Sequence, residues 1–381
     1  MELFKNKDDC CGCNTCEIVC PMKAITMQAD KEGFLYPNID NDKCINCGLC
    51  KKNCSFQSIN SINKTNEFPI IYAVKNKDND IRKRSTSGGV FTNLSEYIIS
   101  NHGIVYGAVL NKDLKVIHEK AETMDGIERM RGSKYVQSEL KNVFVQIKDE
   151  IKTRKVLFTG TPCQISALKL YLRNQNLDNL YLCDIVCHGV PSPKLWFEHI
   201  SFIEKHFKKR ISNYQFRSKI NGWGNHTEVV YFTDGTYVYK SSIVQSFKYL
   251  FYTNAALRPS CYKCKYANLN RESDITIADF WGIEKNAPDF IDSLGVSLTM
   301  INTKKGLSLF ESISSDIISI NCDLQKSLQP NMINPTKERI DRNVFWNIYY
   351  NKGYKNLLKK YSSYGLYYHT RQIIKKILGM K

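Results

Sequence analysis

Hydrophobic and polar positions from residue 70 onward follow two alternating patterns. Short continuous apolar runs, typical of buried strands, are separated by stretches in which apolar residues recur every three or four positions, as on one face of a helix. Strands that alternate with helices favour an α/β body with a partly parallel sheet. The predicted strands are 70–74, 104–110, 155–159 and 180–186; the predicted helices are 90–98, 140–151 and one that begins near 162; and 228–240 is predicted to be a hairpin.

The first 60 residues have a different pattern and hold nine cysteines. Eight of them form two runs of the same spacing, Cys10-x2-Cys13-x2-Cys16-x3-Cys20-Pro21 and Cys44-x2-Cys47-x2-Cys50-x3-Cys54. In bacterial ferredoxins three thiolates of such a run hold one [4Fe–4S] cluster, and the fourth ligates the other cluster. We therefore predict an α+β dicluster ferredoxin module with a short hairpin at 24–37. The predicted ligands are Cys10, Cys13, Cys16 and Cys54 for one centre and Cys20, Cys44, Cys47 and Cys50 for the other.

A pair of zinc knuckles would also use C-x2-C pairs. Zinc explains two identical four-cysteine runs poorly, because one of them is followed by the proline that is typical of ferredoxins. The sequence departs from the ferredoxin pattern at two places. Ser55 stands where a proline often follows the second run, and that residue shapes a turn without binding iron. Cys11 is an extra thiol, and we predict Cys10 as the ligand because only Cys10 has the x2 spacing to Cys13.

Composition agrees with metal or redox chemistry inside the cell. Hydrophobic residues make up 43% of the 381 residues and charged residues 24%, which is typical of a globular protein and not of a disordered one. The chain has no apolar run of 18 residues and no signal-peptide pattern at its start, so we expect a cytoplasmic protein. In a reducing compartment 15 cysteines indicate metal binding and not disulfides.

The charge of the chain is +17 and is unevenly distributed. Residues 1–60 hold 7 lysines and 8 acidic residues, so the excess of basic residues belongs to the rest of the chain. Acidic partner proteins, anionic cofactors and nucleic acids all favour such a surface, as does simple solvation. A nucleic-acid binder would need a basic stripe with aromatic residues along one groove, and we do not expect nucleic acid among the partners.

Two further cysteines follow predicted strands, at the sheet edge where ligands bind in open α/β folds. Cys163 and Cys187 hold these positions, and Cys261-x2-Cys264 forms another ligand pair in a loop. Cys183 and Cys322 are expected to be buried small apolar residues. The remaining four loop thiols, Cys163, Cys187, Cys261 and Cys264, match the number that a third [4Fe–4S] cluster requires. The alternative is that the first two only pack, while the C-x2-C pair binds zinc or nothing.

Two loops before helices are candidates for binding an anion. Gly88 and Gly89 precede a predicted helix and would allow a phosphate close to the backbone, with hydroxyls from Ser85, Thr86 and Ser87 nearby. A helix that begins near Pro162 would likewise present free amides. An ordinary helix N-cap with a flexible segment before it also explains the Ser-Gly-Gly sequence.

The C-terminal part of the chain is strongly basic. From Thr336 onward it holds 11 basic and 2 acidic residues, and the apolar residues at 373–378 share one helical face. Three interpretations remain open for this tail. It could be a helix that contacts a membrane surface, a docking face for an acidic redox protein, or a terminal helix that packs on the core.

Six short motifs occur together in an order that resembles a known family. Together they resemble the coenzyme F-420 hydrogenase/dehydrogenase beta-subunit family, with the dicluster ferredoxin domain in front, from about residue 5 to about residue 320. The motifs are Ser85-x-Ser87-Gly88-Gly89, Gly132-Ser133-Lys134-Tyr135, Gly160-Thr161-Pro162-Cys163-Gln164, Cys187-His188-Gly189-Val190-Pro191-Ser192-Pro193, Cys261-x2-Cys264-x-Tyr266-Ala267 and Ser273-Asp274-Ile275-Thr276-x-x-Asp279-Phe280-Trp281-Gly282.

The resemblance implies a flavoprotein that binds FAD and iron–sulfur clusters and moves electrons between a two-electron carrier and one-electron centres. Relatives in this family use a deazaflavin coenzyme, reduce chlorophyll-related substrates with ferredoxin, or occur among polysaccharide-biosynthesis genes. Carried over onto this chain, the residues around the flavin would be Ser87, Gly88, Gly89, Lys134, Gly160, Thr161 and Pro162. No catalytic residue is assigned.

The resemblance also suggests a division of the chain into four parts. We expect a dicluster ferredoxin domain at 1–60, an N-terminal domain of the family at 67–153, its C-terminal domain at 154–320, and a basic helical tail at 321–381.

Taken together, these features predict a cytoplasmic iron–sulfur flavoprotein oxidoreductase with two [4Fe–4S] clusters, a third [4Fe–4S] cluster and FAD. Ferredoxin or a similar acidic carrier would exchange single electrons with it. The protein would reduce or oxidise an unidentified small-molecule substrate, with polysaccharide biosynthesis as one setting. The cofactors supply the chemistry, while the protein orients them. The alternative is an electron-transfer subunit of a larger redox complex, with no substrate of its own.

Overall fold

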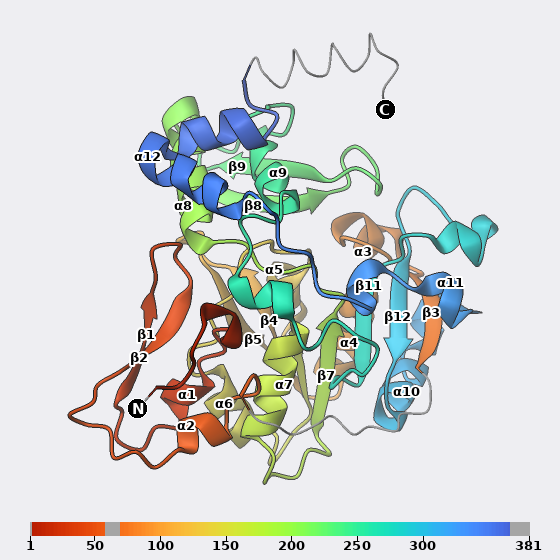
Figure 1. Cartoon of the computed structure of the whole chain (residues 1–381). Coiled ribbons are helices and arrows are strands. Elements are labelled where there is room, and N and C mark those ends of the chain that lie inside the picture. The colour runs from red at the N-terminus through yellow and green to blue at the C-terminus, as the bar shows by residue number, and fades with distance from the viewer. Residues whose placement is uncertain (1, 58–68, 366–381) are drawn as a thin grey trace.

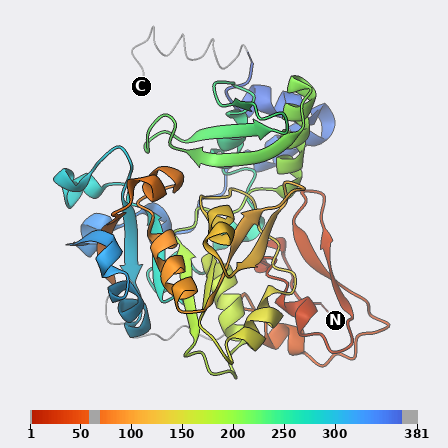
Figure 2. The ribbon, with the colours of Figure 1, turned by 180° about the vertical axis from the view of Figure 1, so that it is seen from behind.

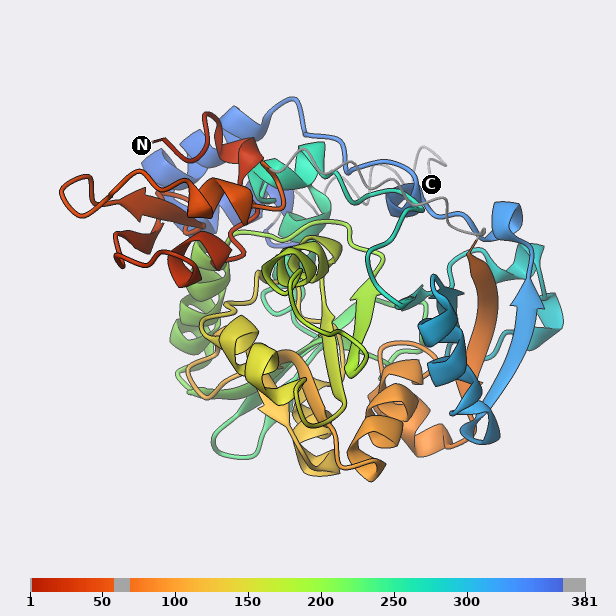
Figure 3. The ribbon, with the colours of Figure 1, turned by 90° about the horizontal axis from the view of Figure 1, so that it is seen from below.

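The computed structural model describes residues 2–57 and 69–365. The N-terminal module lies at one end of the molecule, and strands β3 (Ile70–Asn76) and β13 (Ile317–Cys322) lie at the other end (Figures 1 and 3). A mixed sheet with helices on both faces runs between them. Within the described ranges, no helix combines the length and the apolar character that crossing a membrane requires.

The N-terminal module is built around an antiparallel hairpin of β1 (Ile25–Ala29) and β2 (Leu35–Ile39), which confirms the hairpin predicted between the cysteine runs. Asp30 shapes its turn, because the carboxylate accepts hydrogen bonds from the amides of Glu32 (2.9 Å) and Phe34 (3.0 Å). Each cysteine run contains one short helix, α1 (Thr15–Ile18) in the first and α2 (Leu49–Lys52) in the second. The module therefore has the predicted α+β character.

The body contains one eight-stranded sheet. Across the sheet the order is β13, β3, β12 (Ser297–Ile301), β11 (Ile275–Asp279), β7 (Leu180–Ile185), β6 (Val156–Gly160), β4 (Ile104–Leu110) and β5 (Val116–Ala121). The central strands β11, β7, β6 and β4 are parallel, and the outer pairs are antiparallel. The predicted α/β body with a partly parallel sheet is confirmed, and the four predicted strands are β3, β4, β6 and β7.

The first strand of the body joins the sheet far from the strands that follow it in sequence. β3 lies between β12 and β13, so residues 70–76 pair with residues 297–301 and 317–322. Because of this pairing, strands from both predicted domains of the body belong to one sheet. The predicted division between residues 153 and 154 therefore falls inside a single sheet.

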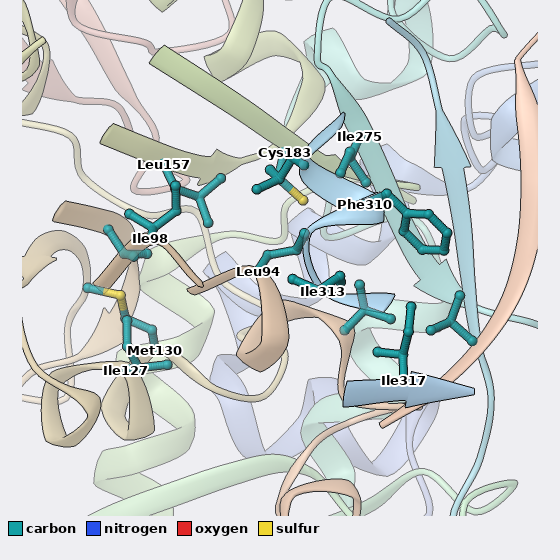
Figure 4. Packing of buried hydrophobic residues seen from close by; sticks show 14 of the residues in the cluster. Leu94, Ile98, Ile127, Met130, Leu157, Cys183, Ile275, Phe310, Ile313 and Ile317 are labelled. Atoms are coloured by element: carbon teal, nitrogen blue, oxygen red, sulfur yellow. The ribbon is translucent and has the colours of Figure 1, made fainter. Parts of the chain in front are cut away.

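Helices cover both faces of the sheet because successive side chains of each strand point to opposite faces. One face packs against α4 (Val90–Ser100), α5 (Met124–Met130) and α10 (Lys304–Glu311). Figure 4 shows this core, in which Leu94 of α4, Leu157 of β6 and Phe310 of α10 are buried together. Cys183 belongs to the same cluster and is 1% exposed, as predicted for a core cysteine.

The opposite face of the sheet packs against α6 (Val143–Glu150) and α7 (Pro162–Tyr171). The helix predicted at 140–151 is α6, which begins three residues later, at Val143. The helix predicted near 162 is α7, with Pro162 in its first turn, where its missing amide hydrogen costs nothing. Together the two faces give the body the layered arrangement that buries both sides of a parallel sheet.

A second, three-stranded antiparallel sheet lies above the large one in Figure 2. Its strands are β8 (Ile211–Ser218), β9 (Thr227–Phe232) and β10 (Tyr237–Val238), and the β9–β10 pair confirms the predicted hairpin. The remaining helices are α3 (Asn79–Arg84), α8 (Pro193–Phe207), α9 (Ser246–Tyr252), α11 (Leu324–Ser327) and α12 (Arg342–Tyr361).

The described part of the basic tail packs on the core. Helix α12 buries Phe345, Trp346 and Leu357 against residues of α8 and α9. Cys322 ends β13 and is 7% exposed, as predicted for a buried cysteine. The apolar face predicted at 373–378 lies outside the described residues.

Candidate metal centres

Four cysteines of the N-terminal module line a hollow at the surface. Cys20, Cys44, Cys47 and Cys50, which we call site B, surround a space of about 350 Å³ including its open mouth. The other side chains of the lining are apolar, and the Ala24 amide donates a hydrogen bond to the Cys20 sulfur over 3.3 Å. Site B therefore offers four thiols, of which Cys47 is exposed and Cys50 is buried.

A second hollow of about 370 Å³ lies deeper in the same module. Cys10, Cys13, Cys16 and Cys54, which we call site A, are all in its lining. Cys54 comes from the second run and lies with the three cysteines of the first, while Cys20 of the first run lies in site B. The structure thus brings together the two groups of four that the spacing predicts, including the exchange of the fourth cysteine.

The backbone of the cysteine runs turns sharply at Gly12 and Gly48, where φ is +72° and +73°. These values suit glycine because a side chain is disfavoured there. At Gly12 a side chain would also have no room, since an added Cβ would lie 2.7 Å from Nη1 of Arg258. Gly12 therefore allows an arginine of the body to approach the first cysteine run.

The four remaining loop cysteines also come together. Cys187 lies close enough to Cys163, Cys261 and Cys264 for their charges to affect its thiol. We call these four cysteines site C. Two backbone contacts bring the loops together: Pro191 forms a bridge with Leu257, and the Arg258 amide donates to the Val190 carbonyl. The Val190 amide donates to the Cys261 sulfur over 3.4 Å. Segments 163, 187–191 and 257–264 thus meet at the carboxyl edge of the parallel strands.

Sites A and C are neighbours, and Cys11 lies between them. Its thiol packs against both Cys13 of site A and Cys163 of site C, and the interaction lowers the pKa of both thiols while that of Cys11 rises. Cys11 packs with Phe56 and Tyr266 in one apolar cluster. The Tyr266 hydroxyl donates to the Ser55 carbonyl over 2.9 Å. The loop that carries Cys264 is therefore attached to the end of the second cysteine run.

Burial keeps most of these thiols protonated in the absence of a metal. Desolvation raises the pKa of Cys54 to about 12, that of Cys261 to about 12 and that of Cys264 to about 11. A metal reverses this preference, since a coordinating thiol is deprotonated outright. The donor set, four thiols on largely apolar walls, fits iron–sulfur clusters, which are held by four cysteine thiolates.

As the side chains stand, no three His, Cys, Asp or Glu residues within 2–57 and 69–365 converge on a position for a single metal ion. In sites A and B the thiols line the walls of the hollows instead.

Comparison with known families agrees with this arrangement. Residues 9–58 match a 4Fe-4S dicluster domain. Residues 71–144 match the N-terminal part of the coenzyme F420 hydrogenase/dehydrogenase beta subunit, and residues 153–322 match its C-terminal part. The chain belongs to the coenzyme F420 hydrogenase/dehydrogenase beta-subunit family. The resemblance inferred from the motifs is confirmed, and the family is one of oxidoreductase subunits.

Among curated proteins, this beta-subunit chain is similar to a subunit of the F(420)H(2) dehydrogenase of Methanosarcina mazei, with 23% identity over 190 residues. The match covers 47% of this chain and 53% of the relative, so the chain spans about half the length of the curated relative that it matches. Among solved structures it resembles a chain of the F420-reducing [NiFe] hydrogenase complex from Methanosarcina barkeri, with 19% identity and a TM-score of 0.47. That match covers 67% of this chain and 82% of the other.

In this beta-subunit chain, the lysine predicted to contact the flavin is fully engaged with the backbone. The Lys134 ammonium is buried at the end of α5 and donates to the carbonyls of Arg129 (3.1 Å), Met130 (2.7 Å) and Arg131 (3.1 Å). Burial lowers the pKa of Lys134 to about 7. A lysine held in this way caps a helix and, as placed, has no free donor for a phosphate.

The Ser-Gly-Gly loop is engaged in the same way. The Ser87 hydroxyl donates to the Val296 carbonyl over 2.6 Å, and the Gly88 amide donates to the Ser297 hydroxyl over 2.9 Å. An added Cβ at Gly88 would lie 2.1 Å from the Val74 carbonyl oxygen, so the close approach at this glycine is to β3. Gly89, with a φ of +94°, immediately precedes helix α4.

The third predicted flavin loop also satisfies its own backbone. The Thr161 amide donates to Gln164 Oε1 over 2.9 Å, and Pro162 occupies the first turn of α7. An added Cβ at Gly160 would lie 2.9 Å from the same oxygen of Gln164. As placed, the Lys134 ammonium, the Ser87 hydroxyl and the amides of Gly88 and Thr161 all have protein partners. The flavin contacts remain a prediction.

The most extensively bonded residue beside the cysteines was missed by the sequence analysis. Arg258 is 1% exposed, and its guanidinium donates to the Cys10 carbonyl, the Leu35 carbonyl and Gln137 Oε1. Gln137 in turn donates to the Cys11 carbonyl over 2.8 Å. The sequence carries only a weak signal, an arginine three residues before Cys261. Its partners lie far away in the chain, so no local spacing shows them.

The last motif of the family also builds a buried charge pair. Asp279, at the end of β11, accepts from Arg217 over 3.0 Å and from the Trp223 indole over 2.8 Å. Trp281 stacks on Trp223 with ring centroids 4.9 Å apart and is 44% exposed. The motif therefore orders an aromatic surface at the carboxyl edge of the sheet.

Proposed function

We propose that this chain is an electron-transfer subunit that holds [4Fe–4S] clusters at sites A, B and C. Clusters held there would accept and release single electrons. The observation that carries the proposal is the packing of Cys11 against both Cys13 and Cys163, because it puts sites A and C next to each other. Adjacent sites suit a relay, and the match to a dicluster domain supports iron–sulfur chemistry.

The ligand assignment follows the grouping of the thiols. Three cysteines of one run with the last of the other serve sites A and B, which is the ferredoxin arrangement. The thiols of site C come from three separate segments of the body. That these segments converge at the carboxyl edge of the sheet supports a cluster over the alternative of two merely packed cysteines.

The protein partner should be a one-electron carrier that docks over site B. Met22, Ile45 and Leu49 in the lining of that site are 45%, 61% and 37% exposed, and Cys47 is exposed between them. Small apolar surfaces of this kind suit the brief encounters of redox proteins. Four exposed lysines are within two residues of the lining residues in sequence and favour an acidic carrier such as ferredoxin: Lys23, Lys43, Lys51 and Lys52.

At the other end of the relay the family implies a two-electron carrier, FAD. Among its predicted contacts, the Ser87 hydroxyl, the Gly88 amide and the Lys134 ammonium are hydrogen-bonded within the chain. The relatives are named as parts of an F(420)H(2) dehydrogenase and of an F420-reducing [NiFe] hydrogenase complex. These names suggest that this chain acts within a larger redox complex. In the second form of the proposal, the protein has a substrate of its own, in polysaccharide biosynthesis or elsewhere.

Reconstitution of the full chain under anaerobic conditions tests the proposal. Iron and sulfide are measured per chain, and about four irons are expected for each site. Cys47→Ser, Cys16→Ser and Cys264→Ser should each remove about four irons, because each takes a ligand from a different site. Cys183→Ser is the control, since that thiol is buried in β7 away from the three sites. Stoichiometric zinc, or full iron content in Cys264→Ser, would contradict the corresponding assignment.

Flavin analysis of the same preparation decides the second part. About one FAD per chain would support the flavoprotein form, and its absence from a preparation with full iron would leave the electron-transfer subunit. The two outcomes also separate a protein with a substrate from a protein that only relays electrons, because hydride chemistry requires the two-electron carrier.

A further inference from the structure

Arg258 is a buried cation in contact with a predicted cluster ligand. Its Nη2 lies 3.6 Å from the Cys10 sulfur, and its Nε donates to the carbonyl of the same residue over 2.8 Å. The guanidinium packs over the Tyr36 ring, 4.3 Å from its centroid, and 5.5 Å from that of Phe34. These contacts hold the charge against the wall of site A, and the charge also acts on thiols of site C.

Among the described residues that line site B, there is no comparable cation. Apart from its cysteines, the side chains that line its hollow are apolar, and the lysines around it are exposed to solvent. Exposed charges act through water and are screened by salt, whereas a buried charge acts through a medium of much lower dielectric constant. The two sites of the ferredoxin module therefore differ in this one buried charge as well as in their exposure to solvent.

A buried positive charge favours the reduced form of a neighbouring cluster. Reduction adds one negative charge, and hydrogen bonds to the sulfurs together with net charge set the potential of iron–sulfur clusters. An arginine keeps its charge throughout, since its guanidinium is not deprotonated in proteins. Asp9, in the lining of site A, opposes this effect, but its carboxylate is only partly buried and accepts from the Asn6 amide.

We propose that Arg258 is a positioning residue that makes the reduction potential at site A more positive than that at site B. The proposal rests on the proposed function, because it requires clusters at both sites. It gives electron flow a direction: an electron that arrives at the exposed site B is favoured at site A, next to site C. The step moves one electron, which one site loses and the other gains, and no bond forms or breaks.

The test is a redox titration of the reconstituted full chain, followed by electron paramagnetic resonance. Arg258→Gln removes the charge but keeps a donor, and Arg258→Lys keeps the charge but loses the forked geometry. At a fixed ambient potential, Arg258→Gln should lower the ratio of reduced to oxidised cluster at site A at least tenfold. This is equivalent to a shift of about 59 mV in its one-electron reduction potential. Arg258→Lys should shift it less, and the potential of site B should not move.

Arg82→Gln is the matched control. Arg82 is also buried, but it pairs with Asp292 and the Gly295 carbonyl near β3, at the end of the molecule opposite to the ferredoxin module. It should leave every potential unchanged.

The outcomes separate the two proposals. If the unsubstituted chain lacks iron at site A, the proposed function fails before Arg258 is tested. If iron is complete in Arg258→Gln and no potential moves, only the role of Arg258 is overturned. Loss of iron from both Arg258→Gln and Arg258→Lys would make Arg258 a purely structural residue and would also overturn the proposal.

Discussion

Cys11, in the first cysteine run, packs against Cys163 at the start of α7. The contact joins the ferredoxin module to the body at the place where sites A and C meet. Both residues are cysteines, yet the sequence assigns them differently: Cys163 lies in a motif of the family, while Cys11 is the extra thiol beside Cys10. The structure places Cys11 in the apolar cluster with Phe56 and Tyr266, where it separates the two groups of thiols.

Replacing Cys11 should therefore not cost a cluster. In Cys11→Ala the iron content of the reconstituted chain should equal that of the unsubstituted protein, because Cys10 has the spacing that site A requires. Cys10→Ala should lose about four irons. Iron and sulfide assays measure both variants.

Cys322→Ala serves as the control for removing a buried thiol, since that residue lies at the end of β13. If Cys11→Ala loses about four irons while Cys10→Ala keeps them, then Cys11 is the ligand and the assignment of site A must change.

Gly88 should be needed for packing and not for access to a ligand. A methyl group in Gly88→Ala would lie 2.1 Å from the Val74 carbonyl oxygen and 2.7 Å from the Ser297 amide nitrogen, so β3 or β12 would have to move. We expect a loss of about 2 kcal/mol or more, within the range of backbone strain and overpacking. The midpoint of thermal unfolding measures the effect.

Gly224→Ala is the matched control, because no atom lies within 4 Å of its added Cβ and its φ is not positive. That variant should be neutral or slightly stabilising, as alanine reduces the entropy of the unfolded chain. Equal midpoints for the two variants would contradict the packing role of Gly88.

The parts of this structure that could be predicted are those with a local signal. Continuous apolar runs indicated the strands β3, β4, β6 and β7, and the repeated cysteine spacing predicted which thiols would meet in sites A and B. Each apolar run and each cysteine run is contained in a short segment, so it can be recognised without the rest of the chain. The Asp234-Gly235 pair predicted the β9–β10 turn for the same reason.

What could not be predicted depends on contacts between distant segments. No local pattern places β3 between β12 and β13, since the pairing partners are more than 200 residues away. The same holds for Arg258, whose acceptors lie at Cys10, Leu35 and Gln137. The contacts of the predicted loops with flavin stay a prediction. In the structure the Ser87 hydroxyl and the Lys134 ammonium have partners within the chain, and a motif does not reveal such tertiary contacts.

The attachment of the ferredoxin hairpin to α12 should be a major source of stability. Arg342 donates two hydrogen bonds to Glu32, of 3.0 and 2.5 Å, and the two side chains are 12% and 8% exposed. In Arg342→Gln the carboxylate would stay buried without its partner, which costs about 3–5 kcal/mol. We expect a marked fall in the midpoint of thermal unfolding. In the double variant with Glu32→Gln, part of the loss should return because no charge remains buried.

Lys152→Gln is the control for this pair. Lys152 pairs with Asp149 over 2.7 Å, but both side chains are more than half exposed, and exposed pairs contribute about 0–1 kcal/mol. If Arg342→Gln and Lys152→Gln shift the midpoint equally, the buried pair does not anchor the hairpin.

His118 should make the protein less stable in acid. Burial lowers its pKa to about 4, and in the unfolded chain a histidine has a pKa of about 6.5. Between these values the unfolded chain binds a proton that the folded chain refuses, so stability falls as the pH drops from 6.5 to 4. At pH 5 the cost is about 2 kcal/mol relative to neutral pH, at about 1.4 kcal/mol per pH unit.

A comparison of two variants isolates this contribution. In His118→Gln the side chain cannot take up a proton but keeps a donor for the Thr159 carbonyl, which His118 Nε2 contacts at 2.9 Å. The fall in the unfolding midpoint between pH 7 and pH 5 should be smaller than in the unsubstituted protein. Some fall should remain, since burial also lowers the pKa of His199 and of His226 to about 3. His102→Gln, an exposed position, should keep the full pH dependence. An unchanged dependence in His118→Gln would show that the proton taken up on unfolding belongs to another group.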